Sequence, residues 1–315
     1  MRKILMDCDT GGDDATAISL AVASDDIELL GVTACMGNLE LSETLRNNLA
    51  LVSYLGVADQ VPVAEGSKDP LVRPRWVGAA GEHRLEMPGL PADSELPAPH
   101  QLDAVEFMAK VLRESDDKVT LIPLAPLTNI AKLMMQYPEL VEEKVDDIIL
   151  MGGGMYFGNT TGAAELNFYA DPEAAKAVFA FGKPVVMCGL DVCYNGYITQ
   201  QENDEIHAIG NKPAEVFYHM TQHTLKWQKE NNGVERALMY DSVPIIYMLH
   251  PELFKTVKAD IQIETTSELC DGMSVCDARV GQEETGRPRI HTVVLDVDRE
   301  GYIERVKEIL KQAGK

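Results

Sequence analysis

Short apolar runs alternate with helix-like stretches along the first two thirds of the chain. The apolar runs are residues 4–6, 27–34, 119–123, 147–151 and 184–188. The stretches with helical spacing are residues 15–23, a segment that ends at Tyr54, and residues 127–136, 172–181 and 200–209. Apolar strands that alternate with helices are typical of a parallel sheet buried on both faces. The pattern predicts an α/β fold with a mainly parallel, Rossmann-like central sheet flanked by helices.

The last third of the chain has a different pattern. Residues 255–264, 273–279 and 290–297 alternate between apolar and polar positions, which predicts a small antiparallel extension near the C-terminus, and residues 299–311 form a closing helix. Before them, residues 213–230 predict a long helix that we expect to act as a lid over the strand ends. No linker or change of composition divides the chain, so we expect one domain spanning residues 1–315.

Composition narrows the possible partners. The chain has 315 residues, 45% of them hydrophobic, and a net charge of −22, which disfavours nucleic acid because binding to phosphates depends on Lys and Arg. No apolar run is long enough to cross a bilayer, and the N-terminal stretch lacks the apolar core of a signal peptide. The six cysteines form no CxxC pair. We therefore expect a soluble, cytoplasmic protein with reduced thiols that binds neither nucleic acid nor membranes.

An acidic cluster follows the first predicted strand. Asp7, Asp9, Asp13 and Asp14 fall within eight residues on a strand-to-helix turn that contains two glycines. In parallel sheets, ligands bind beyond the carboxyl ends of the strands. Carboxylates that converge there repel one another, and a hard cation such as Ca²⁺ or Mg²⁺ relieves the repulsion. The cluster therefore predicts a metal site.

A second polar group follows the strand at 147–151. Asn159, Glu165 and Asn167 lie within nine positions after a glycine-rich turn, and such amides and carboxylates can bind vicinal hydroxyls of a sugar. The alternative interpretation is turn chemistry, because Asn and Gly are common in loops and the sequence from Asp171 begins a helix. The triple glycine is not a phosphate loop, since GxxxxGK[ST] is absent.

Several motifs together resemble one enzyme family. They are DCDTGGDD at 7–14, Gly37-Asn38, PLAPLTNIA at 123–131, MGGG at 151–154, AELN at 164–167, DPEAA at 171–175 and GLDV at 189–192. In this order they resemble the nucleoside hydrolases, the inosine-uridine preferring N-ribohydrolase family, over nearly the whole chain. The resemblance implies hydrolysis of the N-glycosidic bond of a nucleoside to free base and ribose, by an enzyme that forms homodimers or homotetramers.

The resemblance also implies a role for individual residues. One Ca²⁺ would be bound by Asp9, Asp14, Asp241 and the backbone carbonyl of Leu124, with Asp7 just behind the cluster. The ribose would be held by Asp13, Asn38, Asn159, Glu165 and Asn167, with Met151 lining the pocket. Asp9 would accept a proton from a water that Ca²⁺ activates, and the acidic surroundings would stabilise an oxocarbenium-like transition state.

The chain departs from the family where the leaving base is protonated. Many members carry His immediately before the late calcium-binding Asp, whereas this chain has Tyr240, and the His of a family HG segment is replaced by Ala80. A tyrosine with an ordinary pKa of roughly 10 is a weaker proton donor at neutral pH. His223 and Trp227 on the lid-like helix are candidate base contacts, although aromatic residues at helical spacing more often pack in a core.

Two alternative functions stay open from the residues alone. A haloacid-dehalogenase-like phosphatase would use the DxD formed by Asp7 and Asp9, but the second acidic pair and the absence of a basic phosphate cradle argue against it. A family member that binds ribose or nucleosides with weak or altered activity would explain Tyr240.

Among the remaining features, we expect Trp76 to pack or to contact another subunit. We expect His291 to be solvated or to cap a helix.

Overall fold

The computed structural model describes residues 1–76, 85–279 and 287–313. In these ranges nine strands form one sheet in the order β10-β9-β11-β6-β5-β4-β1-β2-β3. The strands are β1 Arg2–Cys8, β2 Ile27–Ala34, β3 Val63–Ala64, β4 Val119–Pro123, β5 Val145–Met151, β6 Val186–Cys188, β9 Phe254–Ile263, β10 Ser274–Asp277 and β11 His291–Val297. A separate ribbon pairs β7 Tyr197–Ile198 with β8 Ala237–Leu238.

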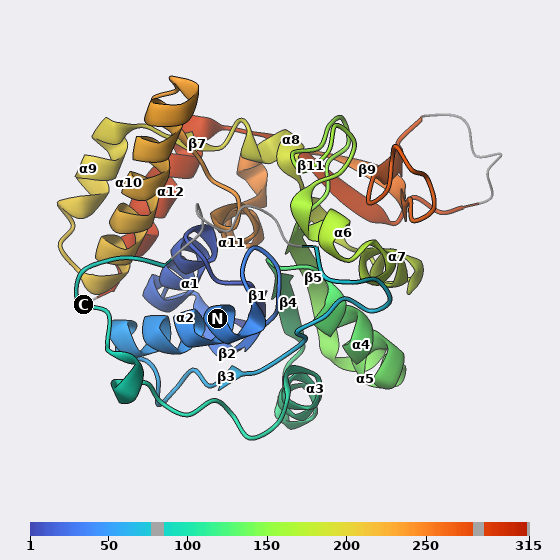
Figure 1. Ribbon diagram of the computed structural model, residues 1–315, viewed down its shortest axis with the longest axis horizontal. Helices are drawn as coiled ribbons and strands as arrows, with labels where there is room; N and C mark the ends of the chain where they lie inside the picture. The colour runs from blue at the N-terminus through green and yellow to red at the C-terminus, as the bar shows by residue number, and fades with distance from the viewer. Residues whose placement is uncertain (77–84, 280–286, 314–315) are drawn as a thin grey trace.

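Helices cover both faces of this sheet. They are α1 Asp13–Ala23, α2 Leu41–Leu55, α3 Ala104–Glu114, α4 Thr128–Gln136, α5 Pro138–Lys144, α6 Leu166–Ala170, α7 Pro172–Ala180, α8 Leu190–Cys193, α9 Gln200–His207, α10 Lys212–Asn232, α11 Ser242–Leu249 and α12 Arg299–Leu310. The apolar side chains of α1, α2, α10, α11 and α12 belong to one core and those of α3, α4 and α7 to another. Helices α9, α10 and α12 lie together at one end of the molecule, and β9 lies toward the other (Figure 1).

The strands serve both cores because successive side chains of a strand point to opposite faces. In β1, Ile4 and Met6 belong to the first core and Leu5 to the second. In β5, Ile149 and Leu150 divide in the same way. A strand buried on both faces is mostly apolar, which explains the near-continuous apolar runs of the sequence.

The predicted fold class is confirmed, with one change in how the extension joins the sheet. β9 pairs antiparallel with both β10 and β11, as the alternating pattern predicts. β11, however, also pairs parallel with β6, through Thr292 opposite Val186. The last strand therefore belongs to the main parallel sheet, and the antiparallel part is continuous with it. Helix α3 and the short strands β3, β7 and β8 add to the predicted pattern.

The prediction that His291 is solvated or caps a helix is wrong. Its side chain is 2% exposed at the start of β11, where Nδ1 accepts a hydrogen bond from the Val185 N–H at 3.3 Å. Its ring packs edge to face against Phe179, with centroids 5.1 Å apart. As for membranes, none of the described helices has the length and apolar character that spanning a bilayer requires.

Candidate active site

A cavity of about 660 Å³ lies beyond the carboxyl ends of the central strands. Its volume is typical of a small-molecule site. Every predicted site residue lines this cavity except Asp14, which lies just behind it. The predicted residues that line the cavity are Asp9, Asp13, Asn38, Leu124, Met151, Asn159, Glu165, Asn167, His223, Trp227, Tyr240 and Asp241. Segments far apart in sequence therefore contribute to one site.

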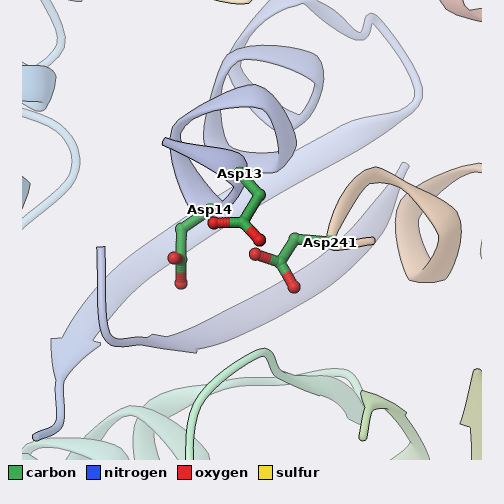
Figure 2. Close-up of side chains that lie close together, drawn as sticks. All are labelled: Asp13, Asp14 and Asp241. Atoms are coloured by element: carbon green, nitrogen blue, oxygen red, sulfur yellow. The ribbon is translucent and has the colours of Figure 1, made fainter. Parts of the chain in front are cut away.

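Three carboxylates converge on one side of the cavity. Asp13 and Asp14 begin helix α1, and Asp241 is the N-cap residue of α11. Ligand oxygens of the three lie within 4.8 Å of one another, and the side chains point toward a common centre (Figure 2). Acids at helix N-termini are favoured by the helix dipole, which partly offsets their mutual repulsion. The fold thus brings together a first-strand motif and a residue more than two hundred positions later.

Asp9 lies next to this trio but does not belong to it. Its side chain is 1% exposed, and Oδ2 accepts a hydrogen bond from the Asn38 N–H at 2.6 Å. Gly37 permits this approach, because a Cβ at that position would lie 2.1 Å from Asp9 Oδ2. Burial, together with the charges of Asp13 and Glu165, raises the pKa of Asp9 to about 7. The family resemblance implies that Asp9 binds the metal and Asp13 the sugar, whereas the tightest group of carboxylates contains Asp13 and not Asp9.

The acidic trio has the chemistry of a cation site. Burial, reinforced by the neighbouring carboxylates, raises the pKa of Asp14 and of Asp241 well above the ordinary value of an aspartate. Oδ1 of Asp13 and Oδ1 of Asp14 are buried and have no hydrogen-bond partner among the described residues. Buried, unpartnered carboxylate oxygens are costly unless an ion or proton compensates them. An all-oxygen donor set fits a hard divalent cation such as Ca²⁺ or Mg²⁺.

Asp7 faces away from the cavity. Its Oδ1 accepts hydrogen bonds from Thr33 Oγ1 at 2.5 Å and from Asn129 Nδ2 at 2.8 Å, and burial raises its pKa to about 6. This carboxylate ties β1 to β2 and to α4 behind the acidic cluster. Such a position does not suit the nucleophile of a phosphatase, which must reach its substrate.

Glu165 has a well-defined structural role at the cavity wall. It is the N-cap residue of α6, and its carboxylate accepts hydrogen bonds from the N–H groups of Gly153, Asn167 and Phe168. Burial raises its pKa to about 7. The interpretation of this loop as turn chemistry therefore holds for Glu165 locally, and the same residue also lines the cavity.

Two asparagines complete the loop. Asn167 Nδ2 donates to the carbonyl oxygens of Leu124 at 2.8 Å and of Met151 at 3.1 Å, which joins the ends of β4 and β5. The Asn167 Oδ1 atom is left with capacity for a ligand hydroxyl. Asn159 Oδ1 accepts a hydrogen bond from the Leu166 N–H at 3.0 Å. These bonds hold both amides at the cavity.

Tyr240 and residues of helix α10 also line the cavity. Tyr240 is half-buried, and desolvation raises the pKa of its phenol, so the hydroxyl stays protonated through the neutral range. His223 is exposed and Trp227 is half-buried, and both line the cavity. Ala80, which replaces the His of the family HG segment, lies outside the described residues.

Several lining residues are absent from the sequence-based prediction. Met220, Thr224, Gln228 and Asn232 line the cavity and follow one another at four-residue spacing along α10, which places them on one helix face. The same four-residue spacing is visible in the sequence and predicts that these side chains share the helix face that carries the cavity wall. Trp76 also lines the cavity and packs edge to face on Tyr169, with centroids 6.1 Å apart. The expected packing role of Trp76 is therefore combined with a place at the site.

Comparisons with known proteins agree with this geometry. A family model described as inosine-uridine preferring nucleoside hydrolase matches residues 4–304. The chain is 40% identical over 311 residues to the pyrimidine-specific ribonucleoside hydrolase RihA of Escherichia coli O1:K1, with 98% of each chain covered.

Two solved structures are similar over nearly their whole length. A purine-preferring ribonucleoside hydrolase from Gardnerella vaginalis matches with a TM-score of 0.85 and 26% identity, covering 99% of this chain and 100% of the other. The plant nucleoside hydrolase PpNRh1 matches with a TM-score of 0.87 and 25% identity, covering 98% and 99%. The chain belongs to the inosine-uridine preferring nucleoside hydrolase family and is a ribonucleoside hydrolase.

Proposed function

We propose that the protein hydrolyses pyrimidine ribonucleosides to free base and ribose, with Asp9 as the general base. The observation that carries the proposal is the buried carboxylate group around Asp9 at the floor of a cavity of about 660 Å³. The preference for pyrimidines is supported by the relatives that are 40% identical over 98% of the chain and are described as pyrimidine-specific.

Asp9, Asp14, Asp241 and the Leu124 carbonyl would hold a divalent cation, for which we propose Ca²⁺. Asp13 lies close enough to two of these carboxylates to contribute a further oxygen. When bound, the cation supplies positive charge that offsets the clustered carboxylates, orients the sugar's diol and lowers the pKa of water in the site. The support is the all-oxygen donor set and its unpartnered buried atoms.

Asp9 is suited to accept a proton from the attacking water. Burial raises the pKa of Asp9 to about 7 in the metal-free chain, and a bound cation would lower it, so the carboxylate would be ionised and able to accept a proton at neutral pH. The Asn38 N–H holds Oδ2 in place, which leaves Oδ1 of Asp9 to take the proton. The carboxylate is thereby oriented before the substrate arrives.

The ribose would be held by Asp13, Asn38, Asn159, Glu165 and Asn167, with Met151 against the ring. Departure of the base leaves positive charge on the sugar, and the surrounding carboxylates stabilise that charge more strongly in the transition state than in the ground state. Trp227 and His223 would contact the base. Tyr240 would donate a hydrogen bond to the departing base as negative charge builds up on it.

The test is ribose release from a panel of purine and pyrimidine ribonucleosides by wild type and by Asp9→Ala. Loss of a general base costs about 10²- to 10⁴-fold, so we expect turnover of uridine and cytidine to fall by at least about 10²-fold. Asp9→Ala activity within tenfold of wild type, or wild-type activity confined to purines, would contradict the corresponding part of the proposal. A member that only binds nucleosides would release no ribose from any of them.

We also propose that the protein acts as a homodimer or homotetramer. This follows from the family's assembly and is tested by analytical ultracentrifugation of the purified chain. A monomer at micromolar concentration would exclude it.

A further inference from the structure

Residues 271–274, at the entry to β10, contact three segments that also carry cavity-lining residues. We call this segment the brace. It follows the turn between β9 and β10, in the antiparallel extension of the sheet. None of its residues lines the cavity.

Ser274 holds the backbone of the glycine-rich loop at two points. Its hydroxyl accepts a hydrogen bond from the Gly154 N–H at 3.0 Å and donates one to the Gly154 carbonyl oxygen at 2.7 Å. The side chain is 2% exposed, so water cannot easily replace it. Gly154 adjoins Gly153, whose N–H is bonded to Glu165 Oε2 at 2.8 Å. A shift of the Gly154 peptide would therefore be transmitted to the Glu165 carboxylate.

Gly272 packs directly on the segment that contains Glu165. Its φ is +79°, a conformation that favours glycine. A Cβ at this position would lie 2.9 Å from the Tyr169 Cα and 3.2 Å from the Ala164 Cβ. The backbone of the brace thus approaches both ends of the 164–169 segment, and no larger residue fits between them.

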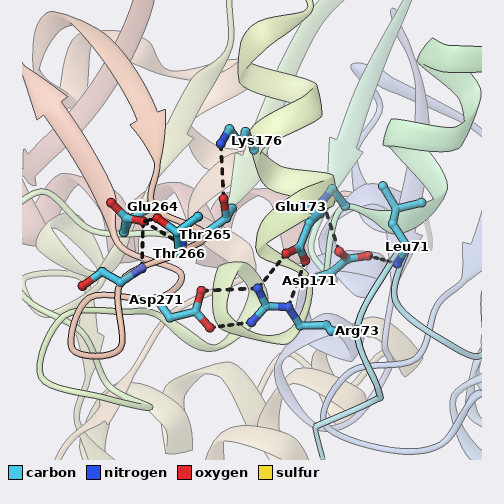
Figure 3. A network of polar contacts seen from close by, with 11 residues as sticks. Leu71, Arg73, Asp171, Glu173, Lys176, Glu264, Thr265, Thr266 and Asp271 are labelled. Atoms are coloured by element: carbon cyan, nitrogen blue, oxygen red, sulfur yellow. Dashed lines mark hydrogen bonds and ion pairs between the residues drawn. The ribbon is translucent and has the colours of Figure 1, made fainter.

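Asp271 connects the brace to the segment that precedes Trp76. Its carboxylate forms an ion pair with Arg73, whose guanidinium also binds Glu173 of α7 at 2.7 and 2.9 Å (Figure 3). The side chains of all three residues are about three-quarters buried, at 25–27% exposure. Arg73 lies three residues before Trp76, which lines the cavity.

The brace is itself fixed to Glu264, the residue that follows β9. The Gly272 N–H donates to the Glu264 carbonyl at 2.8 Å, and the Glu264 N–H donates to the Met273 carbonyl at 3.0 Å. The Glu264 carboxylate accepts hydrogen bonds from the N–H groups of Thr266 and Ser267, which orders the turn. The brace can therefore act as a rigid support.

We propose that the brace positions the loop of residues 152–167, and that Ser274 is the positioning residue whose two hydrogen bonds set the location of the sugar-binding groups. The inference rests on the proposed function, because it assigns Asn159, Glu165 and Asn167 to the ribose. A displacement of such groups by about 1 Å can lower the reaction rate by up to roughly 10²-fold.

The test compares wild type, Ser274→Ala and the control Val275→Thr, which changes the adjacent, 49% exposed residue of the same strand. For each protein, kcat/KM is measured on uridine and on 2′-, 3′- and 5′-deoxyuridine. We expect Ser274→Ala to lower kcat/KM on uridine by about tenfold and to reduce the discrimination against at least one deoxy analogue. Misfolding alone lowers kcat/KM on all four substrates equally and leaves the ratios unchanged.

A second measurement does not depend on activity. Amide hydrogen exchange over residues 154–163 should become faster in Ser274→Ala, with no change in Val275→Thr. Ser274→Cys keeps the side-chain shape with a slightly larger atom and weakens both bonds, so it should shift exchange in the same direction if Ser274→Ala does not fold. Unchanged exchange, or unchanged ratios for all three analogues, would overturn the brace. Absence of uridine hydrolysis in wild type would overturn the proposed function, while the exchange result would still decide the brace.

Discussion

Tyr240 allows a prediction about the leaving base. Burial raises the pKa of its hydroxyl and so keeps it protonated. The hydroxyl can therefore donate a hydrogen bond to the base, but it gives up its proton less readily than a carboxylic acid or an imidazolium would. Tyr240→Phe should therefore lower kcat on uridine by about 10- to 100-fold, while hydrolysis of an activated nitrophenyl riboside should change less than about threefold. The activated group departs without help from a proton donor.

The two substrates act as each other's control, because both require the acidic half of the site. Steady-state kinetics on both would show the difference as a ratio that does not depend on the active fraction of enzyme. Equal losses on good and poor leaving groups would mean that Tyr240 shapes the cavity and has no role in base departure.

His291 gives a prediction on pH and stability. Burial lowers its pKa below the ordinary value of 6.5, so the folded chain keeps the ring neutral where the unfolded chain takes up a proton. The contribution of His291 to stability is therefore complete above about pH 7 and falls as pH drops through about 6.5 toward the lowered folded value.

His291→Asn tests this sign, because the amide oxygen can accept the Val185 N–H without titrating. Urea unfolding at several pH values from about 8 to about 5.5 should show the stability advantage of wild type over the variant shrinking at the acidic end. Parallel pH curves for the two proteins would indicate that His291 is not buried as a neutral ring.

Local sequence pattern predicts the position of some site residues and not of others. Asp13 and Asp14 could be placed at a strand end from local pattern alone, because a strand-to-helix turn fixes where neighbouring residues lie. The convergence of Asp241 on them came from the family resemblance, since no local pattern links residues so far apart. The burial of His291 could not be predicted, because an imidazole at a strand end can face solvent or the core with the same sequence pattern.

At the scale of single elements, Asp171 supports two parts of the fold. It is the N-cap residue of α7, accepting from the Ala174 N–H, and it also accepts hydrogen bonds from Thr128 Oγ1 at 2.6 Å and the Leu71 N–H at 2.9 Å. Its side chain is fully buried. Asp171→Ala should lower the free energy of unfolding by about 2–4 kcal/mol, because a cap is lost and buried donors lose their partner.

Asp103→Ala is the matched control for this change. Asp103 caps α3 through one hydrogen bond to the Glu106 N–H and is exposed, so its loss should cost only about 1 kcal/mol. Urea denaturation of both variants gives the comparison directly. Similar losses in the two would show that the bonds of Asp171 to α4 and to the 71 region contribute little.

The strands themselves were predicted better than the pairing between them. The runs at β1, β2, β4, β5 and β6 are apolar and bounded by turn residues, which suffices to identify buried strands. Alternation in β9 and β11 indicates strands, but it does not say which neighbour a strand pairs with, so the parallel pairing of β11 with β6 was missed. β3 has two residues and carries no periodicity.

At the scale of the whole molecule, one continuous sheet runs from β3 to β10. Both faces are covered by cores that include residues from the N-terminal and C-terminal parts of the chain. We therefore propose that residues 1–315 behave as a single domain, as the uniform composition suggested. The residues that line the cavity range from Asp9 to Asp241, so the site depends on the folding of both parts.

The net charge of −22 and the largely buried acidic trio predict that a bound cation increases the stability of the fold. An ion that binds the folded chain and not the unfolded chain stabilises by about 2.7 kcal/mol when present at roughly 100 times its Kd. We therefore expect Ca²⁺ to raise the thermal midpoint of metal-free protein by several degrees, and a chelator to reverse the change. Asp241→Asn should remove most of this increment, because it takes one carboxylate from the trio, whereas the exposed Asp116→Asn should keep it. If Ca²⁺ raised the midpoint of Asp241→Asn as much as that of wild type, the stabilising ion would bind elsewhere and the trio would need another counter-charge, such as shared protons.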